Sequence, residues 1–450
     1  MMMLADIAAL FNVEKRIVDA EITGVSTDSR SIEKGNLFVA LKGENFDGHD
    51  YLEAVEEKGA VAAIVDRDVP LGIPTINVKD TLMALGEMAA WWRQQLQLQV
   101  VGLTGSNGKT TVKDMLSSIL SEVGAVASTR GNFNNDIGLP LTLLQMKPEH
   151  EFAVIEMGAN HAGEIAYLTN ITRPDVAILN NAGAAHLEGF GSLQGVAEAK
   201  GEIFSGLGRD GVAVINIDDH YADYWISLCD NHKKIFFGFS TAADVTTTTL
   251  AEGYSGCFVL ATPEDETEVC LKVLGIHNLK NALAASAAAI ALGVNNNVIK
   301  KGLEKFSGVK GRLQLNSAAN DSVVIDDSYN ANPTSMKAAI DVLSQQQKPS
   351  LLVIGDMGEL GDDAGKLHAE IGEYAKEKKI NLLMTLGELS KQAAKSFGEN
   401  AKAYEEKQTL ISDVNKKLEE GIAVLVKGSR SMRMEEVVAA LIDKNNTGTA

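Results

Sequence analysis

The chain has 450 residues, of which 45% are hydrophobic and 22% charged, and its formal net charge at pH 7 is −19. This length predicts two to four domains, and this composition is typical of a folded globular protein rather than a disordered one. The negative charge disfavours a nucleic-acid partner, so any phosphate group must be held by local donors and metal ions.

Cysteine content and apolar segments bear on the cellular location. The chain has three cysteines, Cys229, Cys257 and Cys270. They contain no C-x-x-C pair and are not the even number of a disulfide framework, which favours free thiols in a reducing cytoplasm. The N-terminal segment contains Asp6 and does not begin with basic residues, whereas a secretion signal does. The longest apolar stretch, residues 282–294, is shorter than the roughly 20 residues of a membrane span. We therefore expect a cytoplasmic protein that does not bind membranes.

The predicted elements divide the chain into three parts. Residues 1–82 hold the β-rich runs LFVALKG and AVAAIVD around one helical segment, YLEAVEEKG, and TLMALGEMAAWWRQQL predicts a connecting helix. In residues 83–310, strand-like runs alternate with helical ones from residue 99 onward, which predicts a mostly parallel sheet wrapped by helices. The pattern changes at SGVKGRLQ, and residues 311–450 again read as a nucleotide-fold-like α/β unit. We expect an α/β protein with these three domains.

The segment VVGLTGSNGKTTVKDML predicts a strand, a tight loop and the start of a helix. Gly105 and Gly108 permit a turn that directs backbone N–H groups and the helix N-terminus at anionic oxygens. Lys109 can reach outer phosphates, and Thr110 can offer a hydroxyl to Mg²⁺. The strict pattern requires glycine where this chain has Leu103, so a glycine-rich turn with a surface lysine is the alternative.

Two further polar residues follow predicted strands of the same domain. VIEMGANH places Glu156 at a strand end, and AILNNAGAAHLEGF places His186 after another strand. Either residue could instead have no functional role. The glutamate could be solvated, and the histidine could make structural hydrogen bonds. Beside a phosphate-binding loop they become candidate metal ligands, because Mg²⁺ at a nucleotide is held by few protein groups plus phosphate oxygens. Histidine is the weaker candidate, since it is not a typical Mg²⁺ ligand.

A series of motifs resembles a known family. Its motifs occur in the order seen in the Mur ligases of peptidoglycan synthesis, above all in the D-alanyl-D-alanine-adding branch. In this chain they are GSNGKTT, IEMGANH, HLEGFGS, AKGEIF, GIHNLKNALAA, GRLQ, DDSYNANP, GDMGELG and KGSRSMRMEEV. STDSRSIEKGNLFVALKGENFDGHDY near the start extends the resemblance over nearly the whole chain. Ala185 is a departure, because several relatives have aspartate before the histidine of the HL segment, and no role of that aspartate can be transferred.

The resemblance implies a UDP-binding N-terminal domain, a central P-loop ATPase and a C-terminal Rossmann-like domain that receives the incoming amine. It also implies a reaction with ATP and two Mg²⁺ ions. ATP phosphorylates the terminal carboxylate of a UDP-N-acetylmuramoyl-tripeptide, and the amine of D-Ala-D-Ala attacks the acyl phosphate. We expect the enzyme to act as a monomer.

The resemblance also implies roles for individual residues. ATP binding falls to Gly105, Ser106, Asn107, Gly108, Lys109, Thr110, Thr111, Asn281 at the adenine, Arg312 near the outer phosphates and Asp327 at the ribose, with His277 and Asn278 opening the adenine segment. Metal binding falls to Thr110, Glu156, His186 and Lys200, and the catalytic set is Lys109, Lys200 and His186. Substrate binding falls to Ser29 and Arg30 for uridine, Asn134 and Asn135 for the muramoyl-peptide, and Lys427, Ser429 and Arg430 for the dipeptide carboxylate, with Arg433 in reserve.

Lys200 allows two interpretations. Its spacing in GVAEAKGEIF is that of a solvated helix lysine. The family resemblance implies instead a lysine carbamylated by carbon dioxide, which replaces a cation with an ordinary pKa of about 10.4 by an anion with two oxygens. Only the carbamate can serve as a hard oxygen ligand of Mg²⁺, and we favour it.

Two other functions remain open. A relative such as folylpolyglutamate synthetase or a cyanophycin-type ligase would share the ATPase core, but the segment TDSRSIEKGNLFVALKGENFDGH disfavours it. A P-loop switch or motor NTPase would need a strict Walker A loop and partner-binding elements. The sequence does not show whether the third residue of the tripeptide is meso-diaminopimelate or lysine, nor which base deprotonates the amine.

Overall fold

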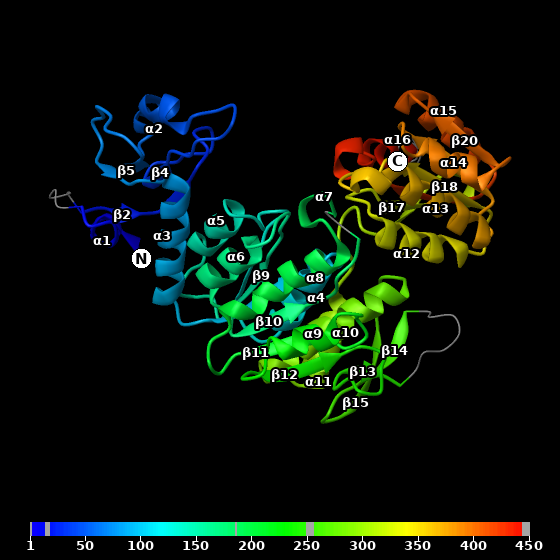
Figure 1. The fold of residues 1–450 in the computed structure, drawn as a ribbon, viewed down its shortest axis with the longest axis horizontal. Helices are drawn as coiled ribbons and strands as arrows, with labels where there is room; N and C mark the ends of the chain where they lie inside the picture. Colours follow the sequence, from blue (N-terminus) through cyan, green and yellow to red (C-terminus); the bar gives the residue numbers. More distant parts are fainter. Residues whose placement is uncertain (1, 14–18, 185–186, 249–255, 443–450) are drawn as a thin grey trace, which may run out of the picture.

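The structure is a computed structural model that describes residues 2–13, 19–184, 187–248 and 256–442. Figure 1 shows three bodies in chain order, with the blue N-terminal part at one end and the orange C-terminal part at the other. Each contains its own parallel sheet. The expected three-domain α/β fold is confirmed. Among the described residues, no helix is long and apolar enough to cross a membrane.

The N-terminal body is built on a small parallel sheet of order β3-β4-β5-β6. Its strands are β3 (Gly24–Ser26), β4 (Asn36–Val39), β5 (Ala62–Val65) and β6 (Thr75–Asn77), and β1 (Met2–Met3) pairs antiparallel with β2 (Glu21–Ile22). Its helices are α1 (Leu4–Leu10), α2 (Leu52–Glu57) and the connecting α3 (Thr81–Gln95).

Helix α3 joins the first two bodies, as its helical spacing predicts. Asp80 caps its N-terminus by accepting N–H bonds from the first turn, and Leu85, Met88 and Trp92 are buried. Trp92 Nε1 donates to Met146 O over 2.9 Å, which ties α3 to the central body. Its apolar face completes one core shared by both bodies.

The central body has a six-stranded, all-parallel sheet of order β12-β11-β10-β7-β9-β8. Its strands are β7 (Gln99–Thr104), β8 (Val126–Ser128), β9 (Phe152–Glu156), β10 (Val176–Leu179), β11 (Val212–Asn216) and β12 (Lys233–Phe237). The helices are α4 (Lys109–Leu120), α5 (Gly138–Leu144), α6 (Glu164–Thr172), α7 (Leu187–Phe190), α8 (Leu193–Gly201), α9 (Ala222–Ser227), α10 (Ile276–Ala291) and α11 (Asn296–Lys305).

Both faces of the central sheet are covered. Val100 of β7 points into the core formed with α5, α6, α8 and α9, whereas Val101 points into the core formed with α4, α10 and α11. Successive residues of a strand face opposite sides of the sheet, so a strand covered on both faces is apolar throughout. This explains the continuous apolar runs in the sequence.

A small antiparallel sheet corrects the expectation about the cysteines. Strands β13 (Thr246–Thr247), β14 (Cys257–Ala261) and β15 (Glu266–Cys270) place Cys257 directly opposite Cys270, and the two form a disulfide. The expectation of free thiols at these positions is wrong, because hairpin register decides which cysteines meet. Cys229 is free and buried, and burial raises its pKa to about 12. The cysteines therefore no longer argue for a reducing compartment.

The C-terminal body has a six-stranded sheet of order β16-β17-β21-β18-β19-β20, parallel except for the edge strand β16. Its strands are β16 (Gln314–Ser317), β17 (Val323–Asp327), β18 (Ser350–Gly355), β19 (Leu382–Leu386), β20 (Ala401–Tyr404) and β21 (Ala423–Lys427). Helices α12 (Pro333–Ser344), α13 (Ala364–Glu377) and α14 (Lys391–Phe397) cover one face, and α15 (Lys407–Leu418) and α16 (Glu435–Ile442) cover the other.

We retain domains 1–82, 83–310 and 311–450 as a proposal. The first boundary falls just inside α3, and the second falls between α11 and β16. Because α3 packs into one core shared by the first two bodies, the exact residue at which the first domain ends is a matter of definition.

Candidate active site

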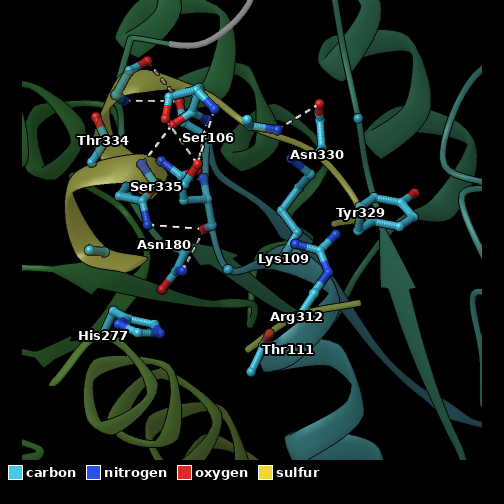
Figure 2. Close-up of a pocket in the computed structure, with 18 of the residues that line it drawn as sticks. Ser106, Lys109, Thr111, Asn180, His277, Arg312, Tyr329, Asn330, Thr334 and Ser335 are labelled. Carbon is cyan, nitrogen blue, oxygen red and sulfur yellow. Dashed lines mark hydrogen bonds between the residues drawn. The ribbon is translucent and has the colours of Figure 1, made fainter. Parts of the chain in front are cut away.

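A cavity of about 820 Å³ lies between the central and C-terminal bodies. Its walls are the loops that follow β7, β9, β10 and β11 on one side and β17, β18 and β21 on the other. In α/β sheets, ligands bind in the crevice at the carboxyl ends of the strands. This cavity, part of which Figure 2 shows, is therefore the candidate active site.

Gly108 shows why the loop after β7 needs glycine. Its φ is +81°, and a Cβ there would lie 2.6 Å from Asn180 Nδ2 and would collide with Asn281 Oδ1. Both the left-handed backbone and the close approach exclude a side chain. Helix α4 begins at the next residue, so its N-terminal N–H groups face the cavity.

The neighbouring Asn107 is held from both bodies. Its N–H donates to Asn181 Oδ1 over 2.9 Å, and its carbonyl accepts from Asn180 Nδ2 and Asn181 Nδ2. Its Oδ1 accepts from Asn332 Nδ2 of the C-terminal body over 2.8 Å. Ser106 Oγ bonds to Gly183. The loop is thus preformed, and the sequence interpretation missed Asn180, Asn181 and Asn332.

Lys109 lines the cavity beside this loop. Its Nζ donates to Gly105 O over 2.7 Å, so the lysine folds back over the loop. Burial lowers the pKa of Lys109. The charge of Glu156 raises this pKa, whereas the charge of Arg312 lowers it further. Figure 2 shows Lys109 beside Arg312, whose charge acts on it. Thr111, the other threonine of the motif, is buried at the cavity wall.

Glu156 is the centre of a polar cluster. Its Oε2 accepts from Thr110 Oγ1 over 2.9 Å, and its Oε1 accepts from Asn134 Nδ2 over 2.8 Å. Thr110 Oγ1 also accepts from Arg312 Nη2 over 3.1 Å. Glu156 is only 3% exposed. The structure therefore brings together four predicted site residues from separate parts of the chain.

Two residues that the sequence interpretation missed support this carboxylate. Thr129, directly after β8, accepts the Glu156 N–H on its Oγ1 over 2.9 Å. Buried Lys113 Nζ donates to Thr129 O over 2.8 Å and lies 3.0 Å from Asp114 Oδ1. Thr129 thus extends the pairing of β8 with β9 past the end of β8, and it holds Glu156 in position. The only sign of the link between Lys113, Thr129 and Glu156 is that Lys113 of α4 is unusually buried for a lysine.

Lys200 is not a solvated helix lysine. It lies on α8, is 1% exposed, and its Nζ lies 5.8 Å from the centroid of the Phe190 ring. Burial lowers the pKa of Lys200 well below its ordinary value, and the charge of Lys109 adds to this. Among the described residues, no carboxylate lies within 4 Å of its Nζ. His186, the other predicted ligand here, lies outside the described residues.

The predicted adenine segment lies at the start of α10. Asn281 Oδ1 accepts from Asn180 Nδ2 over 3.2 Å, and Asn278 Nδ2 donates to Leu274 O over 2.8 Å. His277 lines the cavity (Figure 2), and burial lowers its pKa to about 4, with a smaller effect from the charge of Lys427. The neutral ring can therefore face a nucleotide without carrying charge.

Asp327 and Lys427 form a buried pair at the ends of β17 and β21. Lys427 Nζ lies 2.6 Å from Asp327 Oδ2 and also donates to Asn330 O over 2.8 Å. Asp327 Oδ1 accepts the Leu313 N–H over 3.2 Å. Lys427 is buried, with 3% of its surface exposed. Parallel pairing of β17 with β21 brings these residues together.

Arg430 and Ser429 lie on the C-terminal wall of the cavity. The Arg430 guanidinium is 5.9 Å from the Tyr329 ring, the Arg312 guanidinium is 4.5 Å from it, and Arg430 also pairs with Glu435 over 2.9 Å. The Arg430 side chain is 61% exposed. Tyr329 was missed as a site residue, although the motif DDSYNANP contains it.

The remaining predicted residues are placed as follows. Asn135 lines the cavity, and its Oδ1 accepts the Gly138 N–H over 2.9 Å. Ser29 and Arg30 belong to the N-terminal body and are not part of the cavity wall; the Arg30 side chain is 90% exposed and pairs with Asp28. Arg433 pairs with Glu436. The structure thus groups the nucleotide and dipeptide candidates and leaves the uridine candidates apart.

Comparisons with known proteins extend over the same three bodies. Residues 21–93 match the Mur ligase family, catalytic domain, residues 103–289 match the Mur ligase middle domain, and residues 311–430 match the Mur ligase, glutamate ligase domain. The chain is 45% identical to the UDP-N-acetylmuramoyl-tripeptide--D-alanyl-D-alanine ligase of Escherichia coli (strain K12) over 444 residues, which cover 97% of this chain and 98% of that protein.

Two crystal structures show the same fold at higher and lower identity. MurF from Acinetobacter baumannii has a TM-score of 0.92 at 38% identity and covers 98% of each chain. MurF ligase from Thermotoga maritima, in complex with ADP, has a TM-score of 0.86 at 27% identity and covers 95% of this chain and 99% of its own. The chain belongs to the Mur ligase family.

Proposed function

We propose that this Mur ligase uses ATP to join D-alanyl-D-alanine to a UDP-N-acetylmuramoyl-tripeptide in peptidoglycan synthesis. The Escherichia coli relative, at 45% identity, is named for these substrates. The observation that carries the proposal is a phosphate-binding loop that faces a second α/β domain across one cavity. Such a site can activate a carboxylate on one wall and present an amine from the other.

The reaction explains this architecture. A carboxylate is a poor electrophile, so transfer of the terminal phosphoryl group of ATP gives an acyl phosphate with a good leaving group. The dipeptide amine then attacks the acyl carbon, the C–N bond forms and phosphate leaves. Catalysis of both steps rests on positioning and charge stabilisation, for which Lys109 and Arg312 lie beside the loop.

The nucleotide lies, in this proposal, along the loop from Gly105 to Thr111. The Thermotoga maritima relative forms a complex with ADP, which supports nucleotide binding by this fold. We assign Asn281 to the adenine and Asp327 to the ribose. Asp327 is already paired with Lys427, and this pair can hold the carboxylate in a fixed orientation for the ribose hydroxyls.

The residues present fit Mg²⁺. Thr110 Oγ1 and Glu156 Oε2 are 2.9 Å apart, so both oxygens can reach one hard cation. In the described part of the chain no group of three or more acidic, histidine or cysteine side chains is placed to hold a metal ion, so phosphate oxygens and water would complete the coordination of an ion here. Such ions neutralise charge on the phosphates. We propose two Mg²⁺ ions, for which His186 is the weaker candidate ligand.

Lys200 is proposed to carry a carbamate. Burial lowers the pKa of Lys200, which favours its neutral amine, and the neutral amine is the form that adds carbon dioxide. The product is an anion with two oxygens, which creates a hard metal ligand.

The two acceptor substrates are assigned to opposite ends of the cavity. We propose that Ser29 and Arg30 contact the uridine nucleotide and that Asn134 and Asn135 line the path of the muramoyl-peptide. Ser429 and Arg430 are proposed to hold the dipeptide carboxylate. Lys427 has a smaller share in this role, because Asp327 neutralises its charge.

The alternatives are weaker. A folylpolyglutamate synthetase-like ligase would share the nucleotide site, but the relative that matches over nearly the whole chain is named for tripeptide and D-alanyl-D-alanine. A P-loop switch has no use for a second domain hydrogen-bonded to its phosphate loop. We propose a cytoplasmic monomer without nucleic-acid or membrane partners.

The test is a ligation assay with candidate UDP-tripeptides and D-Ala-D-Ala, read by mass spectrometry of the product. We expect phosphate release only when both acceptor and amine are present, and the product mass identifies the third residue of the tripeptide. Phosphate release with ATP alone, at the full rate, would favour the switch function instead.

A further inference from the structure

We propose that Tyr329 is a positioning residue of the ligation reaction, whose ring holds Arg312 toward the phosphates and Arg430 toward the dipeptide carboxylate. This inference rests on the proposed ligase function and concerns the same cavity. Arg312 and Arg430 were assigned to opposite ends of the reaction, and the ring of Tyr329 lies within reach of both guanidinium groups.

The two arginines reach the ring from loops that are far apart in the sequence. Arg312 precedes β16, and its guanidinium carbon lies 4.5 Å from the centre of the Tyr329 ring, as Figure 2 shows. Arg430 follows β21, and the corresponding distance is 5.9 Å. The face of an aromatic ring attracts a cation within about 6 Å of its centre. All three residues line the cavity, so the ring stands between its phosphate side and its dipeptide side.

The backbone around Tyr329 is fixed to both arginine-bearing segments. The Tyr329 N–H donates to the carbonyl of Gly311, the residue before Arg312, over 3.1 Å. The next residue, Asn330, accepts the Arg430 N–H on its Oδ1 over 3.3 Å. The ring is therefore anchored to the two loops whose guanidinium groups it meets, and it can set the position of one relative to the other.

Arg312 depends on the ring because few other groups hold it. Its Nη2 donates to Thr110 Oγ1 over 3.1 Å, whereas its Nε is buried and has no hydrogen-bond partner among the described residues. The charge of Lys109 is also close, since the Arg312 charge acts on the pKa of Lys109. Like charges repel, so an attraction to the Tyr329 ring offsets a force that would move Arg312 away from the phosphate-binding loop.

Arg430 is held at two points. Its guanidinium pairs with Glu435 over 2.9 Å, and its side chain is 61% exposed. An exposed ion pair fixes a long side chain only weakly, because water and salt screen it. The ring of Tyr329 supplies a second contact on the cavity side. A guanidinium fork that is already oriented loses less entropy when it binds a carboxylate, so the ring favours dipeptide binding.

The test compares Tyr329→Leu, which removes the ring, with Tyr329→Phe, which keeps the ring and removes the hydroxyl. In Tyr329→Leu the KM for D-Ala-D-Ala should rise about 2- to 5-fold, the equivalent of one exposed cation–π contact. Hydroxylamine traps the acyl phosphate formed from ATP and the UDP-tripeptide as a hydroxamate. Its formation should slow about 5- to 30-fold, because the Arg312 contact is shorter and less exposed. Tyr329→Phe should restore both quantities.

A double variant separates positioning from a general loss of structure. In an Arg430→Ala background, Tyr329→Leu should not raise the KM for the dipeptide further, because the group that the ring holds is already gone. Hydroxamate formation should still slow in the double variant, since Arg312 is present. An additive rise of the dipeptide KM would show that the ring does not act through Arg430, and it would overturn the proposal.

The matched control is Tyr374→Leu. It removes a ring of α13 that Lys337 and Lys378 approach at 5.6 and 5.1 Å, outside the cavity wall, and it should change neither quantity. If Tyr329→Leu does not fold, Tyr329→Met replaces it, because methionine adapts to irregular gaps.

Two results in folded variants contradict the role of Tyr329. These are unchanged hydroxamate formation and dipeptide KM in Tyr329→Leu, or a Tyr329→Phe variant as impaired as Tyr329→Leu. Either leaves the ligase function intact, provided that wild type forms the dipeptide product. A wild-type enzyme that forms neither hydroxamate nor dipeptide product refutes the ligase function, and the role of Tyr329 falls with it.

Discussion

Asn332 of the C-terminal body donates a hydrogen bond from Nδ2 to Asn107 Oδ1 in the phosphate-binding loop, over 2.8 Å. The other end of the same amide, Oδ1, accepts the Ser335 N–H over 2.9 Å and caps α12. One side chain therefore starts a helix and joins the two walls of the cavity. Because Asn107 belongs to the phosphate-binding loop, this contact links nucleotide binding to the position of the second domain.

Replacement of Asn332 separates these two roles. In Asn332→Ser the hydroxyl can still cap α12, but it is too short to reach Asn107. We expect an unchanged thermal unfolding midpoint and a KM for ATP that rises about 2- to 12-fold, the equivalent of one hydrogen bond of about 0.5 to 1.5 kcal/mol. Steady-state kinetics and thermal unfolding measure both. An unchanged KM for ATP would show that the contact does not assist nucleotide binding.

Lys109→Ala tests the phosphate-binding loop. The mutant should fold, because the Nζ hydrogen bond of Lys109 within the described part of the chain is to Gly105 O, in its own loop. Amide formation should be abolished, because the charge is needed when phosphates are present. Circular dichroism checks the fold and product formation checks the activity. Near wild-type turnover in a folded mutant contradicts the role of this loop.

Lys200→Ala tests the carbamate. Wild-type protein supplied with ¹³C-bicarbonate should show a protein-bound carbon signal that the mutant lacks, and the mutant should lose most activity because a metal ligand is removed. Lys113→Ala, which removes another buried lysine of the central body, is the control for the label and should retain the signal. A fully active Lys200→Ala without a lost signal would show that Lys200 has only a structural role.

Arg430→Lys tests the dipeptide carboxylate site. Lysine keeps the charge but loses the planar fork, so the KM for D-Ala-D-Ala should rise far more than the KM for ATP or the UDP-tripeptide. The loss of one charge-assisted contact, about 1.5 to 3 kcal/mol, corresponds to roughly 10- to 150-fold in affinity. Arg433→Lys is the matched comparison. An unchanged dipeptide KM, or equal activity with free D-alanine, would place the site elsewhere.

His277 predicts a pH dependence of stability. Burial lowers its pKa in the folded protein from about 6.5 to about 4, so between these values the unfolded chain binds more protons. Its contribution is complete above pH 6.5 and is lost as the pH falls toward 4, at no more than about 1.4 kcal/mol per pH unit. In urea unfolding, the free energy of unfolding should therefore fall less steeply with pH between 6.5 and 4 in His277→Gln than in wild type. His220→Gln, at an exposed position, should not change the slope.

Local sequence patterns predict the layers of the fold and the phosphate-binding loop. Strands covered on both faces are apolar throughout, as Val100 and Val101 illustrate, and this signal is local. The loop from Gly105 to Thr111 is equally local, because its glycines and its lysine are neighbours in the chain. Such features depend on a few consecutive residues, so they can be read before any tertiary contact is known.

Which distant residues meet depends on the tertiary fold. Parallel pairing of β17 with β21 buries Lys427 against Asp327, and hairpin register places Cys257 opposite Cys270. Burial of Lys200 likewise depends on the packing of α8 and not on its spacing. These contacts are set by strand order, register and packing over long stretches of chain, which local patterns do not encode, and it is these contacts that decide the charge each group carries in the site.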